Sequence, residues 1–250
     1  MNKLEIHGLS KVFQSQMGPV TALENIHFDV KEGEFISIVG TSGCGKSTLL
    51  NIISGLESHT TGEILLDQIP VQGPGSDRAV VFQSDATFPW LTVYENIEYG
   101  LKVKKIDPKQ RKQIVEELLS LLELDKFSSA YPKELSGGMR KRIDIGRAYA
   151  VQPEILLMDE PFGALDIVTR EMMQDELLRI WSERKKTVIF ITHDLEEAMY
   201  LSDRIILLSP RPGRIKEVIP IDFPRPRSGQ LRESQEFYQL RNQLRHIMGQ

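Results

Sequence analysis

The chain has 250 residues, of which 40% are hydrophobic and 26% charged, a composition typical of one large globular domain. Its net charge of −4 argues against a nucleic-acid-binding surface, which usually carries a basic excess. The single cysteine, Cys44, excludes an internal disulfide framework. The apolar runs are far shorter than the roughly 18 residues that span a bilayer, so we expect no membrane crossing by this chain itself.

Strand patterns dominate the first part of the chain. Alternating apolar residues at 4–6 and 26–30 predict strands with one buried face, and the continuous run 35–39 predicts a central strand. A helix pattern at 48–54 follows and ends at Gly55. Further short apolar runs predict strands at 64–66, 80–82, 155–158, 188–191 and 205–208.

Between residues 92 and 150 the pattern changes to helix. Thr92 and Glu95 form a capping-box pattern, and Asp107 before Pro108 predicts the start of a second helix. One face of that helix is expected to carry Ile114, Leu118, Leu121 and Leu122. We interpret this region as a helical lobe inserted into a strand-rich core. A proline-rich link at 223–226 then precedes a last helix with an apolar stripe of Phe237, Leu240, Leu244 and Ile247.

Residues 40–48 match the phosphate-binding pattern G-x-x-x-x-G-K-[ST] in full, between a predicted strand and a predicted helix. Glycines let main-chain N–H groups point at phosphate oxygens, and the helix N-terminus adds a partial positive charge. Lys46 is expected to reach the β- and γ-phosphates, and Ser47 to supply an oxygen to Mg²⁺. The expected ATP-binding residues of this loop are Gly40, Thr41, Ser42, Gly43, Cys44, Gly45, Lys46, Ser47 and Thr48.

Cys44 occupies a variable position of the loop, and two interpretations are open. It is either a small residue that fits or a reactive thiol. The second follows because inward-pointing N–H groups and the nearby Lys46 would lower the pKa of the thiol. That interpretation predicts modification by a maleimide and protection by MgATP.

Two acidic residues, Asp159 and Glu160, end the apolar run at 155–158. Ligands of open α/β sheets bind at the carboxyl ends of the strands. Asp159 therefore suits the shell of a metal ion, and Glu160 suits a general base for an attacking water. Acids after a strand are commonly just a solvated turn, but their combination with the phosphate loop favours the functional interpretation.

The segment Leu135-Ser-Gly-Gly-Met139 precedes a helix expected from 140 to 150. A serine and two glycines before a helix offer a hydroxyl and N–H groups to an anion, although alone they would be an ordinary capped helix start. In chain order, the phosphate loop, Gln83, this segment, the acids and His193 resemble the motifs of the nucleotide-binding subunit of an ABC transporter. The resemblance covers residues 1–220.

The resemblance implies an α/β fold: a P-loop NTPase core with an N-terminal antiparallel β subdomain and an inserted helical subdomain. It implies an ATPase domain at 1–220, with the core at 1–88 and 155–220 and the helical subdomain at 89–154. Residues 221–250 would form the proline-rich link and a C-terminal helix.

The resemblance also implies roles for individual residues. Phe13 would stack on adenine, unless it is a core residue of its strand. Glu160, Gln83 and His193 would be catalytic, with Gln83 touching Mg²⁺ and the lytic water and His193 bonding the γ-phosphate. The implied metal ligands are Ser47, Gln83 and Asp159. The residues implied to meet the opposite subunit are Ser136, Gly137, Gly138 and Met139 at its ATP and Asp166 at the dimer seam. Met139 replaces the glutamine that is common in the family.

The implied cofactors are ATP and Mg²⁺, and the implied partners are a second copy of the chain and a transmembrane permease subunit. A periplasmic or extracellular solute-binding protein would take part indirectly, and no nucleic acid is expected. The chain would lie peripherally at the cytoplasmic face of the membrane. Phe88-Pro-Trp90, the signature ending in Met139 and the segment 208–214 resemble the nitrate, sulfonate and taurine branch of importers.

Two alternatives to this function stay open: a soluble ABC ATPase outside transport, and an importer ATPase for another small solute. Phe88 and Trp90 also allow two interpretations. They either anchor the helical lobe to the core, or line a groove that receives a short cytoplasmic helix of the permease.

Overall fold

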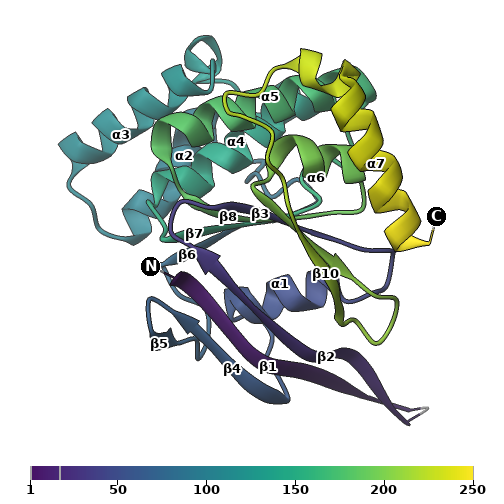
Figure 1. Ribbon diagram of the computed structural model, residues 1–250. Coiled ribbons are helices and arrows are strands. Elements are labelled where there is room, and N and C mark those ends of the chain that lie inside the picture. Colours follow the sequence, from purple (N-terminus) through teal and green to yellow (C-terminus); the bar gives the residue numbers. More distant parts are fainter. Residues whose placement is uncertain (1, 17, 250) are drawn as a thin grey trace. The chain divides into compact units, whose positions relative to one another are not determined.

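The computed structural model describes residues 2–16 and 18–249 (Figure 1). The chain divides into two compact units. Unit 1 comprises Met1–Gly75 and Leu177–Gln250, and unit 2 comprises Ser76–Glu176. Residues of the long helix α5 (Ile167–Arg184) fall in both units.

Unit 1 contains a four-stranded antiparallel sheet in the order β2-β1-β4-β5. Leu4 pairs with Val30 and Ile6 with Phe28, so the alternating apolar residues share one buried face. The N-terminal strands predicted from alternation are confirmed. The strands are β1 (Asn2–Ser15), β2 (Gly18–Lys31), β4 (Thr61–Leu66) and β5 (Ile69–Pro70).

A second group of strands in unit 1 runs in the order β10-β9-β3-β8. The strand β3 is parallel to both of its neighbours, whereas β10 is antiparallel to β9. Every residue of β3 and β8 is buried, which explains their continuous apolar sequences. The bounds are β3 (Phe35–Val39), β8 (Thr187–Thr192), β9 (Arg204–Leu208) and β10 (Ile215–Pro220).

The helices of unit 1 include α1 (Lys46–Ser54), α6 (Leu195–Leu201) and α7 (Gln235–Met248). As predicted, α1 ends at Gly55, whose N–H donates to the carbonyls of Asn51 and Ile52. In α7, Phe237 and Leu244 are buried and Leu240 and Ile247 are half-buried, which confirms the predicted stripe. A 3-10 helix, Gly229–Glu233, precedes α7.

Unit 2 combines two parallel strands with helices α2, α3 and α4. Thr92 caps α2 by the predicted capping box, since its hydroxyl accepts from Glu95 N at 3.2 Å and its own N–H donates to Glu95 Oε2 at 2.8 Å. The bounds are β6 (Arg78–Val81), β7 (Ile155–Asp159), α2 (Val93–Val103), α3 (Pro108–Leu121) and α4 (Gly137–Ala150), with 3-10 helices Asp125–Phe127 and Pro132–Glu134.

The predicted apolar face of α3 was partly wrong. Ile114 and Leu121 are only half-buried. The buried set is Val115, Leu118, Leu119 and Leu122. These four follow the i, i+3, i+4, i+7 spacing of a helix stripe, so packing selects the face one residue further along.

The predicted start of α4 at residue 140 was also wrong, because the helix begins at Gly137. The hydroxyl of Ser136 accepts from Met139 N at 3.3 Å and caps the helix earlier than expected. A Cβ on Gly138 would lie 3.0 Å from Thr169 Cγ2, so a glycine allows the first turn to approach α5 closely. The serine-glycine segment is therefore the first turn of the helix and its cap.

No helix within residues 2–16 and 18–249 is both long and apolar enough to cross a membrane.

Candidate nucleotide site

Two adjacent parallel strands of unit 1 carry the phosphate loop and His193. Val39 at the end of β3 pairs with Thr192 at the end of β8. The loop begins at Gly40 and the histidine follows Thr192, so both leave the same edge of the sheet. In Figure 1 the chain continues from β3 through this loop into α1. The sheet therefore brings together two motifs that lie 153 positions apart in the sequence.

At two positions of the phosphate loop, the packing of neighbouring atoms leaves room only for glycine. A Cβ on Gly40 would lie 2.5 Å from Cys44 Sγ and 3.2 Å from the carbonyl oxygen of Leu208. Gly45, which caps α1, has a φ of 104°, and a Cβ there would lie 2.7 Å from Leu23 Cδ2. Any larger residue at either position would displace the loop or its support.

Lys46 is folded over the loop. Its side chain is nearly buried, with 6% exposure of the residue, and Nζ donates to Gly40 O at 2.8 Å and Thr41 O at 3.4 Å. Ser47, in the first turn of α1, is exposed. The loop thus presents an ammonium group and a hydroxyl at a helix N-terminus, which suits a bound phosphate.

The interpretation of Cys44 as a reactive thiol is wrong. The residue is only 1% exposed, and its sulfur lies against the position where Gly40 lacks a side chain. Its main-chain N–H donates to Thr41 O at 3.2 Å within the loop. Because the thiol packs under the loop, the other interpretation, a small residue that fits, is the better description.

Phe13 lies on β1 and is 37% exposed, so it is not a core residue. Lys11 Nζ lies 4.8 Å from the centre of its ring, within the range of a cation–π contact. Hydrogen bonds to Glu57 Oε1 at 2.7 Å and to Ser58 O at 2.6 Å hold that lysine. The ring is therefore presented on the surface of unit 1, where stacking on a base is sterically open.

His193 is exposed in a tightly bonded turn between β8 and α6. The N–H of Asp194 donates to Thr192 Oγ1 at 3.0 Å. The Asp194 carboxylate caps α6 by accepting from Glu196 N at 2.8 Å and Glu197 N at 3.3 Å. The histidine is thus joined to both the strand and the helix by a short, rigid connection.

Unit 2 also has two adjacent parallel strands, β6 and β7, with predicted site residues at their carboxyl ends. Val81 at the end of β6 pairs in parallel with Met158 near the end of β7. Gln83 lies two residues after β6, Asp159 is the last residue of β7 and Glu160 follows it, so the three predicted residues lie at the same edge of these strands. Parallel strands place such residues where α/β proteins bind ligands.

Glu160 has a φ of 42°, a left-handed conformation that is uncommon for a residue with a side chain. Its carbonyl accepts from Gly163 N at 3.1 Å and closes a tight turn. A Cβ on Gly163 would lie 3.7 Å from Gln83 Nε2 and 3.9 Å from Glu160 Cβ. Gln83 and Glu160 therefore flank the same glycine, which could not be foreseen from their separation in sequence.

A buried charged group on α4 holds the Gln83 segment, and the sequence interpretation missed it. Lys141 Nζ donates to Phe82 O at 3.0 Å and Gln83 O at 3.3 Å, while Asp144 lies 3.6 Å from the same Nζ. Asp144 also accepts from Ala86 N at 3.2 Å. The only available signal was a lysine and an aspartate three residues apart on a helix face that is otherwise apolar.

Burial determines the electrostatics of this group. It raises the pKa of Asp144, although Lys141 and Arg147 lie close and favour the carboxylate. Burial likewise lowers the pKa of Arg147. Asp144 and Arg147 also line a cavity of about 180 Å³, together with Phe82 and Tyr99.

Phe88 and Trp90 are arranged differently from each other. The main chain of Phe88 is held by Asn96, which accepts from Phe88 N at 2.8 Å and donates to Phe88 O at 3.1 Å. The Phe88 ring lies 4.7 Å from that of Tyr99 and under the Arg147 guanidinium. Trp90 stacks on Phe88 at 5.5 Å and is 70% exposed. Phe88 is an anchor within unit 2, and Trp90 belongs to its surface.

The serine-glycine turn and the segment around Asp166 lie on the surface of unit 2. Ser136 is exposed, and Asp166 is exposed with its carboxylate accepting from Thr169 N at 3.0 Å. Hydrogen bonds from Thr169 lower the pKa of Asp166. The next helix begins with exposed Ile167 and Val168, at 72% and 67% exposure. Large exposed apolar residues beside a charged cap are typical of a protein contact.

A complete phosphate loop on a parallel sheet, with acids and a glutamine at the carboxyl ends of further strands, defines a P-loop ATPase. The sequence profile described as ABC transporter matches residues 23–163. The chain therefore belongs to the ABC transporter ATP-binding family.

Individual relatives agree with this assignment. An uncharacterised ABC transporter ATP-binding protein of Methanocaldococcus jannaschii is 49% identical over 246 residues, which cover 98% of this chain and 91% of that protein. The aliphatic sulfonates import ATP-binding protein SsuB of Bacillus cereus is 46% identical over 241 residues, covering 96% and 94%.

A solved ATP-binding cassette, a dimer in a post-hydrolysis state bound to ADP and Pi, has a similar fold. It superposes with a TM-score of 0.75 at 32% identity and covers 88% of this chain and 100% of that one. The predicted ABC ATPase fold is confirmed. The chain binds and hydrolyses ATP, and ABC ATPase domains work as dimers with permease subunits.

Proposed function

We propose that the chain is the ATPase subunit of an importer for a small anionic solute such as nitrate, a sulfonate or taurine. It would bind its permease at the cytoplasmic face of the membrane, and a solute-binding protein outside would deliver the cargo. The observation that carries this proposal is the 46% identity to the sulfonate-import protein SsuB over 96% of the chain. Similarity at that level extends well beyond the motifs that every ABC ATPase shares.

Within this function, we assign the phosphates of ATP to residues 40–48 and the adenine to Phe13. Lys46 would neutralise phosphate charge, and the exposed ring of Phe13 would stack on the base. His193 would donate a hydrogen bond to the γ-phosphate. The exposure of Phe13 and His193 and the bonded geometry of the loop support these roles.

The donor set fits Mg²⁺, because Ser47, Gln83 and Asp159 offer a hydroxyl, an amide and a carboxylate oxygen, the hard ligands this cation prefers. Bound Mg²⁺ would supply neutralisation of the charge that develops on the phosphates. Glu160 would accept a proton from the attacking water, and Gln83 would orient that water. Their positions on either side of Gly163 support this pairing.

We further propose a head-to-tail homodimer in which the first turn of α4 meets ATP held by the opposite subunit. The turn consists of Ser136, Gly137, Gly138 and Met139, with Asp166 at the seam. Its exposed hydroxyl and the exposed apolar start of α5 support a partner on this surface. We also retain the predicted domain boundaries: an ATPase domain at 1–220, its core at 1–88 and 155–220, its helical subdomain at 89–154, and a C-terminal segment at 221–250.

Deleting the gene tests the solute class directly. The deletion strain should fail to grow on at least one of three media, in which an alkanesulfonate or taurine is the sole source of sulfur, or nitrate the sole source of nitrogen. It should grow normally on sulfate and ammonium. The wild-type gene should restore growth, whereas the Glu160→Gln variant should not. Unimpaired growth on all three anions would refute the anion-importer proposal. Sensitivity to DNA damage or a translation defect would instead indicate an ABC ATPase outside transport.

A further inference from the structure

The short helix α6 connects His193 to the C-terminal segment of the chain. It has only seven residues, and a helix of this length has no stability of its own in water. All of its residues except Glu196 are buried. The position of α6 is therefore set by the residues that it packs against. Because hydrogen bonds of Asp194 join β8 to the start of α6, a shift of α6 would also move His193.

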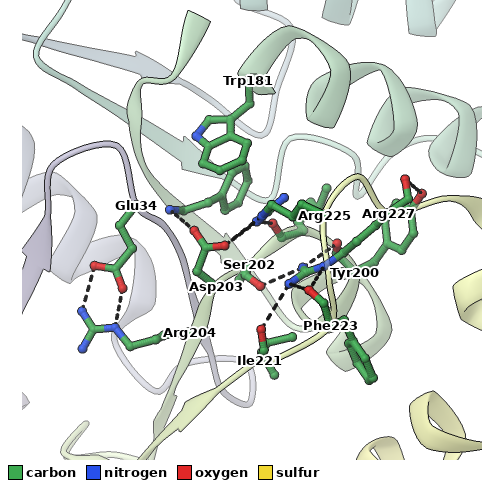
Figure 2. A network of polar contacts seen from close by, with 12 residues as sticks. Glu34, Trp181, Tyr200, Ser202, Asp203, Arg204, Ile221, Phe223, Arg225 and Arg227 are labelled. Atoms are coloured by element: carbon green, nitrogen blue, oxygen red, sulfur yellow. Dashed lines mark hydrogen bonds and ion pairs between the residues drawn. The ribbon is translucent and has the colours of Figure 1, made fainter. Parts of the chain in front are cut away.

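Arg227 holds the C-terminal end of this helix (Figure 2). Its guanidinium donates to the main-chain carbonyls of Met199 at 3.2 Å, Tyr200 at 2.9 Å and Ser202 at 2.8 Å. The last carbonyls of a helix have no partner within the helix, so a cation placed there is favourable. The same guanidinium also donates to Ile221 O and Phe223 O, each at 3.3 Å. One side chain thus joins α6 to the strap at 221–227.

The environment of Arg227 is unusual for a charged group. Burial, reinforced by the nearby charge of Arg225, lowers its pKa to about 10. A buried cation is costly unless its hydrogen bonds are satisfied, and here main-chain carbonyls from two segments satisfy them. A lysine could not replace Arg227. The planar guanidinium presents several donors and reaches both segments at once, whereas the ammonium group of a lysine is compact and could reach only one of them.

Arg225 ties the same end of α6 to the strand that leads into the phosphate loop. It donates to Leu201 O at 2.7 Å and to Asp203 Oδ1 at 2.9 Å, and it stacks over Trp181. Asp203 Oδ2 in turn accepts from Phe35 N, the first residue of β3, at 2.9 Å. Figure 2 shows Asp203 in contact with Arg225.

The other end of α6 is held by α7. Arg241 Nη1 donates to Glu196 Oε1 at 2.8 Å, three residues after His193. Phe237 of the same helix is buried and stacks on Phe223 of the strap at 5.7 Å. The C-terminal segment therefore forms hydrogen bonds with α6 at both of its ends.

We propose that Arg227 and Arg241 are positioning residues for His193, which fix α6 so that the histidine meets the γ-phosphate in one orientation. The proposal rests on the role proposed above for His193. The segment at 221–249 would then take part in the ATPase mechanism through α6.

The main test compares Arg241→Gln with Arg245→Gln, which removes an exposed charge one turn further along α7. Arg241→Gln should lower kcat by roughly 3- to 10-fold and leave KM for MgATP and the melting temperature nearly unchanged, because a misplaced group acts on the transition state. Arg245→Gln should behave as wild type. The exchanged pair Glu196→Arg with Arg241→Glu should recover most of the lost kcat. Wild-type kcat in Arg241→Gln, or an equal loss in both single variants, would overturn the proposal.

A spectroscopic readout separates this proposal from the role of His193. The imidazole NMR signal of His193, assigned by its loss in His193→Ala, should shift in Arg241→Gln and in Arg227→Lys but not in Arg245→Gln. An unshifted signal would overturn the positioning role. Wild-type turnover in His193→Ala would refute the role of the histidine, while the signal would still report whether the arginines hold α6. If Arg227→Lys does not fold, Arg241→Gln decides alone.

Discussion

Two pairs of parallel strands carry the motifs of this ATPase, and they hold them in different ways. After β3, the phosphate loop is supported by neighbours in close packing: Gly40 lies against Cys44, and Gly45 against Leu23. After β6, the Gln83 segment is held from a helix by the buried ammonium of Lys141. The phosphate loop is thus fixed by steric packing. The Gln83 segment depends on a tertiary contact with the buried Lys141, which a change in α4 can move.

This comparison predicts separate defects at the two edges. Lys46→Met should weaken MgATP binding by roughly 10- to 150-fold, from the loss of charge-assisted hydrogen bonds of about 1.5–3 kcal/mol. Glu160→Gln should keep binding and lower the hydrolysis rate by roughly 10² to 10⁴, the usual contribution of a positioned base. Nucleotide titration and steady-state hydrolysis measure both.

The stalled Glu160→Gln variant should also shift to the size of a dimer with MgATP on a sizing column. The melting temperature of Lys46→Met checks that the loop is still folded, since Lys46 donates to two loop carbonyls. Loss of MgATP binding in Glu160→Gln, or normal turnover in that variant, would contradict the prediction that the loop after β3 serves binding and the residues after β6 and β7 serve hydrolysis.

The buried pair of Lys141 and Asp144, which holds the Gln83 segment, should contribute strongly to the stability of the chain. Lys141→Met or Asp144→Asn alone should destabilise the chain by about 3–5 kcal/mol, since each leaves a buried charge short of its partner. The double variant should lose less than the sum by about 0.5–3 kcal/mol, the coupling expected for contacting residues. Urea unfolding gives these values, and each single variant should also lower kcat.

An exposed pair in the same unit is the matched control. Lys112 and Glu116 lie 3.7 Å apart on α3 with side chains 68% and 58% exposed. Lys112→Met should change stability by less than about 1 kcal/mol, as is usual for surface pairs. If the buried and the exposed lysine behave alike, the Gln83 segment is not held by Lys141.

A smaller effect is expected at the aromatic surface next to this segment. Trp90→Ala should change the free energy of unfolding by only about 0.5–1.5 kcal/mol, the loss of one aromatic contact. Basal ATPase should stay near normal, whereas co-purification with the permease should weaken by more than about fivefold, as at a binding hot spot. Phe127→Ala, at another exposed aromatic of unit 2, is the control. A destabilised Trp90 variant that keeps its permease would show that the tryptophan only supports the fold.

The sequence predicted the parts of the molecule that are encoded locally. The helix that ends before Gly55, the capping box at Thr92 and the buried strand at 35–39 each depend on residues close together in the chain, and each is confirmed. The contacts that Lys141, Arg227 and Arg241 make with other segments could not be predicted, because those of Lys141 with Phe82, Arg227 with Ser202 and Arg241 with Glu196 join residues 25 to 59 positions apart and show no pattern. Even the failed expectation for Cys44 has this cause, since only the fold decides which way a loop side chain points.

The left-handed backbone at Glu160 has an evolutionary consequence. A residue with a side chain in this conformation costs on the order of 1 kcal/mol relative to glycine. Selection for stability alone would therefore favour glycine or asparagine at this position, and would remove the carboxylate at the same time. Consensus or thermostability engineering of this chain should leave position 160 fixed, because a substitution that stabilises the backbone there would also remove the general base that we propose.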